Sequence, residues 1–351
     1  MGIMTVNGVI DKEALGITSP HEHALIDIRN QFPGDLSPDA FGIKNRVEAT
    51  HYALLMSDPY ALRDNLVLDD EDLAIREVAR FAQAGGRTFV DVTPPGIGRN
   101  IPFLLRLSAQ TGLNVVAPTG FYTADTHPQR VRRMSVEALA DEMTRELTVG
   151  IGDTLVKAGI IGEIGTSQTL FDEEIKVLRA AALANQRTGT PVMVHLNPWA
   201  QHGQRVIDIL EEGGMRPEQI CICHMDVLLD LKDMRGVLDR GVYLEFDNFG
   251  KEFTSGSAYG RFPSDAERVE VLYQLIEDGY ARQLLLACDV CLKNLLRVHG
   301  GPGYDHILVD IKEMIRRDRP ADFEVFSSLL MENPARYLDN TRLDTRSKMK
   351  M

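Results

Sequence analysis

The sequence has no long hydrophobic run and no excess of positive charge. No apolar stretch of the 351 residues approaches the roughly 18 that a membrane span requires, so we expect no membrane partner. The formal net charge of −13 lacks the basic footprint of a nucleic-acid-binding surface, so we expect no nucleic acid partner either. The first residues lack the basic and continuous apolar regions of a signal peptide, which predicts a cytoplasmic protein.

Cysteine is also scarce, and the four cysteines form two short motifs, Cys221-x-Cys223 and Cys288-x-x-Cys291. A structural zinc site is one interpretation of such spacing. Both pairs lie in apolar, strand-like runs, where a free cysteine behaves as a small buried hydrophobic residue. We therefore favour buried thiols over zinc, and a reducing compartment argues against disulfides.

Short apolar runs alternate with longer amphipathic runs along the chain. The apolar runs are bounded by glycine, proline or polar residues and are too short for helices, which is typical of strands. They cover 16–26, 87–94, 113–122, 157–167, 191–197, 220–226, 242–248 and 284–290. Helical periodicity is found at 70–86, 135–147, 172–189, 205–214 and 266–279, and Ser135 can cap the second of these helices.

Eight strands, each followed by a helical segment, predict an α/β protein whose parallel sheet closes into a (β/α)8 TIM barrel. An open doubly wound sheet is the alternative, but the chain has no complete Gly-x-Gly-x-x-Gly turn between a strand and a helix. We see no internal repeat or low-complexity linker and expect a single domain over 1–351. The irregular segment 28–69 is expected to cover one end of the barrel.

Metal-binding residue types gather where the predicted strands end. In the stretch "SPHEHA", His21 and His23 are two residues apart, so on a strand both point to one face while Glu22 points away. Barrels of this kind form their active sites at the C-terminal ends of the strands. Six metal-type residues occupy such positions: His21, His23, Glu163, His195, His224 and Asp289. Because unpaired buried charges are costly, their convergence predicts cations between them.

These six residues, in this strand order, resemble the binuclear metal centre of the phosphotriesterase family in the amidohydrolase superfamily. The resemblance runs from "GITSPHEH" to "ENPARYL" and is greatest to the branch of phosphotriesterase-related proteins, through "GIIGEIG", "VYLEFD" and "GGPGY". The founding phosphotriesterases carry a carboxylated lysine where this chain has Glu163. That difference fits the related-protein branch and argues against specialised organophosphate hydrolysis.

The resemblance implies two divalent metal ions per chain. His21, His23 and Asp289 would bind the more buried ion, His195 and His224 the more exposed ion, and Glu163 would bridge them; a bridging lysine, with Lys157 as the candidate, is the alternative. A hydroxide shared by both ions would attack the substrate, and Asp289 would take its proton and pass it to the leaving group. Zinc suits an imidazole-rich site, and manganese or cobalt would also fit.

Residues near the same strand ends are expected to contact the substrate. Lys251, Lys293 and Tyr304 would together hold an anionic group, although solvated loop charge is the alternative for the lysines. Tyr122 is expected to line the pocket. Arg99 is instead expected to form a structural ion pair.

We therefore predict an enzyme, a metal-dependent hydrolase acting on a small ester or lactone that can carry an anionic group. The alternatives are an amidase for small N-acyl compounds, a phosphotriesterase, and a metal-containing ligand-binding protein with little turnover. The expected partner is a small-molecule substrate, and the sequence leaves a homodimer open.

Overall fold

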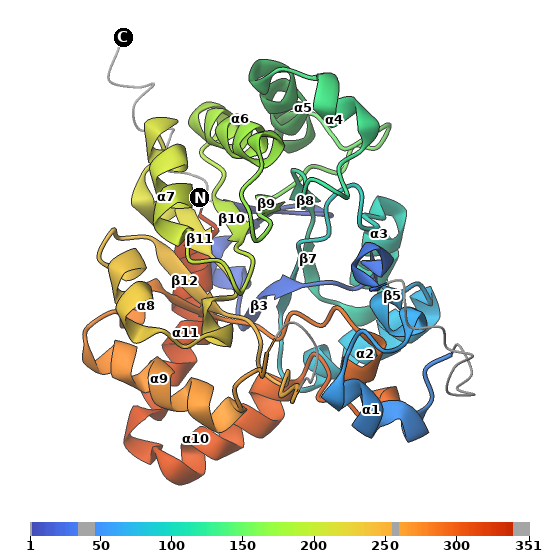
Figure 1. The fold of residues 1–351 in the computed structure, drawn as a ribbon, viewed down its shortest axis with the longest axis vertical. Coiled ribbons are helices and arrows are strands. Elements are labelled where there is room, and N and C mark those ends of the chain that lie inside the picture. The colour runs from blue at the N-terminus through green and yellow to red at the C-terminus, as the bar shows by residue number, and fades with distance from the viewer. Residues whose placement is uncertain (1, 34–45, 255–259, 340–351) are drawn as a thin grey trace.

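The structure, a computed structural model, describes residues 2–33, 46–254 and 260–339 and has the predicted TIM-barrel architecture (Figure 1). Parallel strands form two hydrogen-bonded sheets, in the orders β3-β6-β7 and β8-β9-β10-β11-β12-β13. Only Ala117 separates β7 from β8, so these two are successive parts of the third barrel strand. The barrel strands are β3 (Thr18–Glu22), β6 (Thr88–Asp91), β7 (Asn114–Val116), β8 (Pro118–Thr119), β9 (Ile160–Gly165), β10 (Val192–His195), β11 (Ile220–Ile222), β12 (Tyr243–Phe246) and β13 (Leu284–Leu286). Each predicted strand run contains one barrel strand, in the predicted order, and the run 113–122 contains both parts of the third.

Helices surround these strands, as Figure 1 shows. They are α1 (Tyr52–Ser57), α2 (Glu71–Gln83), α3 (Ile101–Thr111), α4 (Gln129–Arg133), α5 (Val136–Thr148), α6 (Asp172–Thr188), α7 (Gly203–Glu212), α8 (Leu231–Leu238), α9 (Asp265–Glu277), α10 (Lys312–Asp318) and α11 (Phe323–Tyr337). The five predicted helices correspond to α2, α5, α6, α7 and α9, and Ser135 Oγ caps α5 by accepting from the Ala138 N–H at 3.2 Å. Within the described ranges, no helix is both long and apolar enough to cross a membrane.

Apolar side chains fill the barrel and close one of its ends. The interior cluster includes Val90, Val116, Met193 and Leu285 from the strands. It is joined by Ile3, from the hairpin of β1 (Gly2–Thr5) and β2 (Gly8–Asp11), and by Tyr337 of α11. The Tyr337 ring lies 5.1 Å from that of Tyr243, the first residue of β12, so this plug lies at the amino-terminal end of the strands. The cavity described below lies at the opposite, carboxyl end of the strands.

A side chain links the first and last strands, which lie next to each other. The backbone N–H groups of Cys288 and Val290 donate to the Glu22 carboxylate at 3.1 and 2.9 Å, and Ser19 Oγ donates to it at 2.7 Å. Glu22 therefore points away from its neighbouring histidines, as predicted, and fixes the backbone that follows β13.

The described parts of segment 28–69 cover the carboxyl end of the barrel, as expected. They include α1 and β5 (Val67–Leu68), which pairs with β4 (Ile26–Asp27). Asn30, Gln31 and Tyr60 from this segment line the cavity found there.

All four cysteines are free. Cys221, Cys223 and Cys288 are buried, as predicted, whereas Cys291 is half-buried and lines the cavity. In the part of the chain that the structure describes, no group with metal-binding geometry contains two cysteines, so nothing supports the zinc interpretation.

Candidate metal centre

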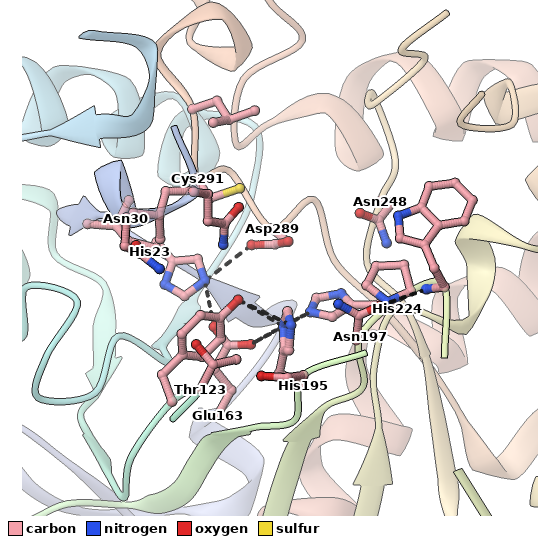
Figure 2. A pocket seen from close by; sticks show the side chains of 18 of the residues that line it. His23, Asn30, Thr123, Glu163, His195, Asn197, His224, Asn248, Asp289 and Cys291 are labelled. Atoms are coloured by element: carbon pink, nitrogen blue, oxygen red, sulfur yellow. Dashed lines mark hydrogen bonds and ion pairs between the residues drawn. The ribbon is translucent and has the colours of Figure 1, made fainter. Parts of the chain in front are cut away.

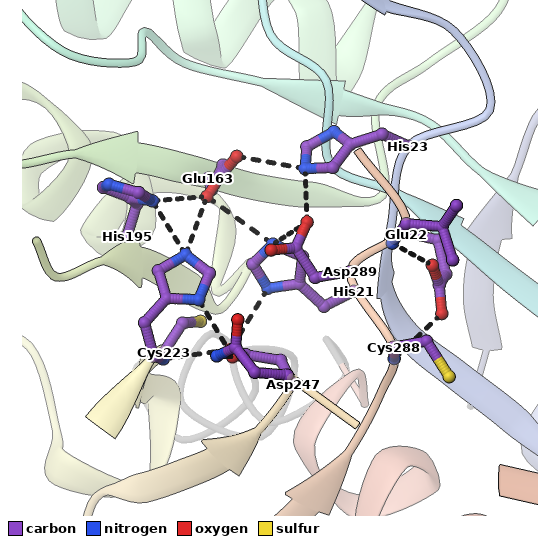
Figure 3. Close-up of polar contacts among 12 residues, drawn as sticks. His21, Glu22, His23, Glu163, His195, Cys223, Asp247, Cys288 and Asp289 are labelled. Atoms are coloured by element: carbon purple, nitrogen blue, oxygen red, sulfur yellow. Dashed lines mark hydrogen bonds and ion pairs between the residues drawn. The ribbon is translucent and has the colours of Figure 1, made fainter. Parts of the chain in front are cut away.

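Glu163 lies at the centre of the predicted metal-binding residues (Figure 3). One of its carboxylate oxygens, Oε2, lies 3.5 Å from His21 Nε2, 3.2 Å from His195 Nδ1 and 3.6 Å from His224 Nε2. The other, Oε1, lies 3.3 Å from His23 Nε2. Four imidazoles from the ends of three strands, β3, β10 and β11, thus face one carboxylate, which is the arrangement expected of a bridging ligand.

Asp289 completes the cluster from the loop after β13. Its Oδ1 lies 3.2 Å from His23 Nε2 and 3.9 Å from His21 Nε2, and its Oδ2 accepts a hydrogen bond from Lys251 Nζ. The backbone at Asp289 is left-handed, with φ +45°, a conformation that few residues with a side chain adopt. The bonds from Cys288 and Val290 to Glu22 hold the chain on both sides of it.

The strand that carries Glu163 approaches its neighbours closely because glycines flank that residue. A Cβ added at Gly162 would collide with the Met193 carbonyl oxygen, and one at Gly165 with the Thr123 backbone nitrogen. Glu163 itself lies within β9, whereas Lys157 precedes the strand. The strand therefore places Glu163, and not Lys157, among the histidines of the cluster.

Carboxylates hold two of the histidines from behind. His21 Nδ1 lies 3.0 Å from Glu245 Oε2, and His224 Nδ1 lies 2.9 Å from Asp247 Oδ1. Asp247 also accepts from the backbone N–H of His224 at 3.0 Å, which supports the left-handed backbone there, with φ +65°. Because a carboxylate only accepts, these contacts assign the proton to Nδ1 and leave the Nε2 lone pair facing the centre.

A hydroxyl does the same for His23. Thr93 Oγ1 donates to the Leu25 carbonyl oxygen at 3.2 Å and lies 2.8 Å from His23 Nδ1. The Thr93 proton is therefore engaged, and its oxygen accepts from the His23 Nδ1–H. His23 Nε2 is left as an acceptor that faces Glu163 and Asp289.

Three of the atoms that face the centre have no hydrogen-bond partner: His21 Nε2, Glu163 Oε2 and Asp289 Oδ1. All three are buried, and an unsatisfied buried polar atom typically costs about 1–3 kcal/mol. Groups of these ligand atoms also lie within 4.8 Å of one another. Imidazole nitrogens and carboxylate oxygens in this arrangement fit divalent metal ions, which would satisfy all three atoms.

The two carboxylates of the cluster are ionised at neutral pH. Burial alone would raise the pKa of Glu163, but its close contacts with the four histidines outweigh burial and hold that pKa well below its usual range. Burial opposes ionisation of Asp289 too, and the Lys251 ammonium with the nearby His23 lowers its pKa. Burial and the neighbouring His224 lower the pKa of His195. Burial would lower the pKa values of His23 and His224, but the neighbouring carboxylates outweigh it and raise them to about 9 and about 10. A metal ion would therefore displace protons from these two rings.

The cluster opens into a cavity of about 410 Å³, within the size range of small-molecule sites (Figure 2). Five of the six metal-type residues line it, and His21 is completely buried. Tyr122 lines the same cavity, as predicted, with its hydroxyl 3.1 Å from His195 Nδ1 and 3.2 Å from Nε2.

The predicted anion-holding group is wrong, because its three members do not come together. Lys251 lines the cavity, but its ammonium is buried and paired with Asp289. Lys293 lies outside the cavity lining, with Nζ 2.6 Å from Asp64 Oδ1. Tyr304 is also outside the lining and donates its hydroxyl to the His23 carbonyl oxygen at 2.8 Å. Sequence position identified the strand end but not the direction in which each side chain leaves the backbone.

The sequence interpretation missed the residues that orient the cluster. They are Glu22, Thr93, Glu245 and Asp247. The two carboxylates of "VYLEFD" carried the same signal as Glu163, since each is a charged residue in an apolar strand. Arg99 was interpreted correctly: its Nη1 and Nη2 lie 2.6 and 2.8 Å from the carboxylate of Glu146.

The model of the phosphotriesterase family matches residues 1–338. The chain belongs to the phosphotriesterase family. Among members of known sequence, the N-acetyltaurine hydrolase of Tetraodon nigroviridis is 36% identical over 346 residues, which cover 96% of this chain and 97% of that protein. The phosphotriesterase-related protein of Nematostella vectensis is 34% identical, over 88% of this chain and 90% of that protein.

A solved structure has nearly the same fold. The crystal structure of a resiniferatoxin-binding protein from Rhodobacter sphaeroides matches with a TM-score of 0.93 and 38% identity, over 96% of this chain and 95% of that one. The family resemblance inferred from the motifs is therefore confirmed, and so is its related-protein branch.

Proposed function

We propose that this member of a hydrolase family cleaves the amide bond of small N-acyl compounds in a metal-dependent reaction. The observation that carries the proposal is the similarity to N-acetyltaurine hydrolase over 96% of the chain. The amide bond thus replaces the ester or lactone as the preferred target, while the hydrolytic site stays the same.

The six residues of the cluster would hold two divalent ions, of which zinc, manganese and cobalt all suit the ligands. The orphaned atoms of His21, Glu163 and Asp289 support this assignment. Such ions supply a Lewis acid for the acyl oxygen and lower the pKa of a water molecule. The residues around them position the substrate and move protons.

Asp289 is the proposed general base. Its Oδ1 faces the centre without a hydrogen-bond partner, while Lys251 fixes its Oδ2. Asp289 would accept a proton from the attacking water and return it to the nitrogen of the leaving amine. An amine leaves as a neutral molecule only after that nitrogen is protonated, so an amidase depends on this transfer more than an esterase does.

Tyr122 is the proposed contact for the acyl group. Its hydroxyl lies at the cavity beside His195 and can donate a hydrogen bond to an acyl oxygen. Lys251 also lines the cavity. Because its ammonium is paired with Asp289, we expect it to orient that carboxylate and not to bind the substrate as a free cation.

A panel of matched substrates tests the function. Purified protein loaded with zinc or manganese is assayed with N-acetyl amines, N-acetyltaurine among them, and with the corresponding acetate esters, a lactone and an aryl phosphotriester. We expect the largest acceleration over the uncatalysed rate for an acetamide. Turnover of esters or lactones alone would overturn the amidase assignment.

A pair of histidine variants provides the control. His224→Asn should abolish the activity, because His224 Nε2 faces Glu163 in the cluster. His299→Asn removes an imidazole from a turn that lies outside the cavity lining, and it should leave the activity unchanged. Equal activity in both variants would contradict the proposal that the cluster is the reactive centre.

A further inference from the structure

One wall of the cavity is built from aromatic side chains. Trp199 and Phe262 meet edge to face with their ring centres 6.0 Å apart, and Phe262 and Phe253 meet in the same way at 5.3 Å. All three line the cavity that contains the metal-type residues, and so does Phe171, which is 50% exposed. We call these four residues the aromatic wall.

The wall is held in place by the loops that carry it. The backbone N–H of Trp199 donates to Asn197 Oδ1 at 3.1 Å. Both residues lie in the loop that directly follows His195, the last residue of β10. The Phe262 N–H donates to the Phe253 carbonyl oxygen at 2.9 Å, which fixes these two rings after β12. At Gly260, an added Cβ would lie 3.2 Å from the Trp199 indole, so the backbone packs directly on that ring. The rings are therefore a fixed surface beside the cluster.

The charges of the cavity do not suit an anionic ligand. Among the described residues that line it, Lys251 is the only lysine or arginine, and its ammonium is paired with Asp289. The lining also contains the Asp125 carboxylate, which accepts from Asn30 Nδ2 at 2.7 Å and from Thr123 Oγ1 at 2.7 Å. A sulfonate or carboxylate placed at the aromatic wall, away from the metal-type residues, would lose its hydration without gaining a free lysine or arginine partner among the described lining residues.

We propose that the aromatic wall binds an apolar group, preferably an aryl group, on the amine side or the acyl side of the substrate. The cavity accordingly selects neutral N-acyl compounds over anionic ones. This inference rests on the proposed amidase function and specifies its substrate class. Three of the four rings are at least partly exposed inside the cavity, whereas Phe253 is buried. Exposed aromatic rings in a reactive cavity mark an apolar ligand surface, because water contacts them at a cost until a ligand covers them.

Two acetamides of equal chain length test the selectivity. N-acetyl-phenethylamine and N-acetyltaurine share the acetyl group, the amide and a two-carbon chain, and they differ in carrying a phenyl or a sulfonate. With the metal-loaded full chain, we expect kcat/KM to be about 10- to 100-fold higher for the phenyl compound, as burial of an aryl group predicts. A preference for N-acetyltaurine would overturn the inference.

Variants of the wall separate binding from structure. Trp199→Ala should lower kcat/KM for N-acetyl-phenethylamine about 5- to 10-fold and leave that for N-acetyltaurine within twofold. Trp199→Phe, which keeps an aromatic ring, should retain most of the wild-type kcat/KM for N-acetyl-phenethylamine. Phe323→Ala, which removes a ring from α11 outside the cavity lining, is the matched control and should change neither value. An equal loss of kcat/KM for both substrates in Trp199→Ala would mean that the aromatic wall has a structural role and does not bind the aryl group.

A binding measurement separates this inference from the proposed function. Trp199 is the only tryptophan of the sequence, so the intrinsic tryptophan fluorescence reports on the wall itself. Methyl phenylpropyl ketone has the shape of N-acetyl-phenethylamine but no bond that can be hydrolysed, and it should change this fluorescence in a saturable way. Such binding without acetamide turnover would refute the amidase function and uphold the aryl site; the absence of binding would refute the site.

A cationic ligand is the competing occupant, because aromatic rings next to a carboxylate also attract a quaternary ammonium group. N-acetyl-aminoethyl-trimethylammonium therefore serves as a third substrate. A preference for it that is lost in Asp125→Asn would overturn the proposal in favour of a cation site.

Discussion

The barrel side and the cavity side of the metal-type cluster differ in how firmly their side chains are held. His224 is 4% exposed, and Asp247 contacts both its ring nitrogen and its backbone N–H. His195 is 13% exposed, and the Tyr122 hydroxyl lies 3.1–3.2 Å from both of its ring nitrogens. Yet His195 Nδ1 and His224 Nε2 lie only 2.7 Å apart and face the same oxygen of Glu163.

From this difference we infer that the two sides of the cluster have different roles, metal binding on the barrel side and substrate turnover on the cavity side. On the barrel side, the partners of His21, His23 and His224 fix one nitrogen of each ring, so the ligand nitrogen is set before any ion binds. Such orienting contacts typically contribute 10–100-fold in metal affinity or activity. On the cavity side, His195 contacts a residue that we expect to touch the substrate. We expect changes on the barrel side to affect metal binding and changes on the cavity side to affect substrate turnover.

The largest effect is expected at Asp289, which belongs to both sides. Asp289→Asn should lower kcat by about 10²–10⁴-fold, the usual contribution of general acid–base catalysis, because an amide cannot accept the proton. The variant should keep its fold and much of its metal, as measured by circular dichroism and elemental analysis. Near-normal kcat in this variant would remove Asp289 from the mechanism.

A smaller effect, on metal binding, is expected at Asp247. In Asp247→Asn, the amide NH2 group would face the donors of His224 or Asn248, so one of these contacts must be lost. Metal affinity, measured by competition with a chelator, should fall about 10- to 100-fold. Glu146→Gln, which alters a structural ion pair with Arg99 instead, is the control and should retain wild-type affinity. Equal affinities of both variants would contradict the division described above.

On the cavity side, Tyr122→Phe should act on turnover alone. Loss of one hydroxyl contact should lower kcat/KM about 2- to 10-fold, the range for a single hydrogen bond, with unchanged metal content. A loss of metal as large as that of Asp247→Asn would mean that His195 is as dependent on its partner as His224 is.

The smallest effect is expected at Lys293. Lys293→Ala breaks a partly exposed ion pair with Asp64 and should cost at most about 1 kcal/mol in the free energy of unfolding. The ratio of KM values for an anionic and a neutral substrate should not change. A selective rise in KM for the anionic substrate would show that Lys293 contacts the substrate after all.

Most of the fold followed from the sequence because strand and helix periodicities are local. The eight strand runs and five helices were predicted, whereas α3 was missed because its sequence begins as an apolar run with a proline, which a first helical turn tolerates. α8 was missed because eight residues give too few repeats of the pattern.

The site was predictable only where a local sequence pattern marks a residue. The six metal-type residues stood out as polar groups within apolar strands, and the structure brings them together. Their partners on other strands, such as Thr93 for His23, depend on contacts that no local pattern encodes. Tyr304 was misassigned for the same reason, since its hydroxyl reaches the backbone of His23 from behind.

The central claim is that Glu163, together with the five other cluster residues, binds two divalent ions without any added group. The most direct test is to deplete the protein of metal and reconstitute it with zinc or manganese, with and without bicarbonate, while counting bound metal and measuring activity. A glutamate is already a carboxylate at neutral pH, whereas a lysine bridge forms only with carbon dioxide. We expect about two ions per chain and full activity in both conditions, and loss of metal in Glu163→Gln. Reconstitution that required bicarbonate, or active protein without bound metal, would contradict the account.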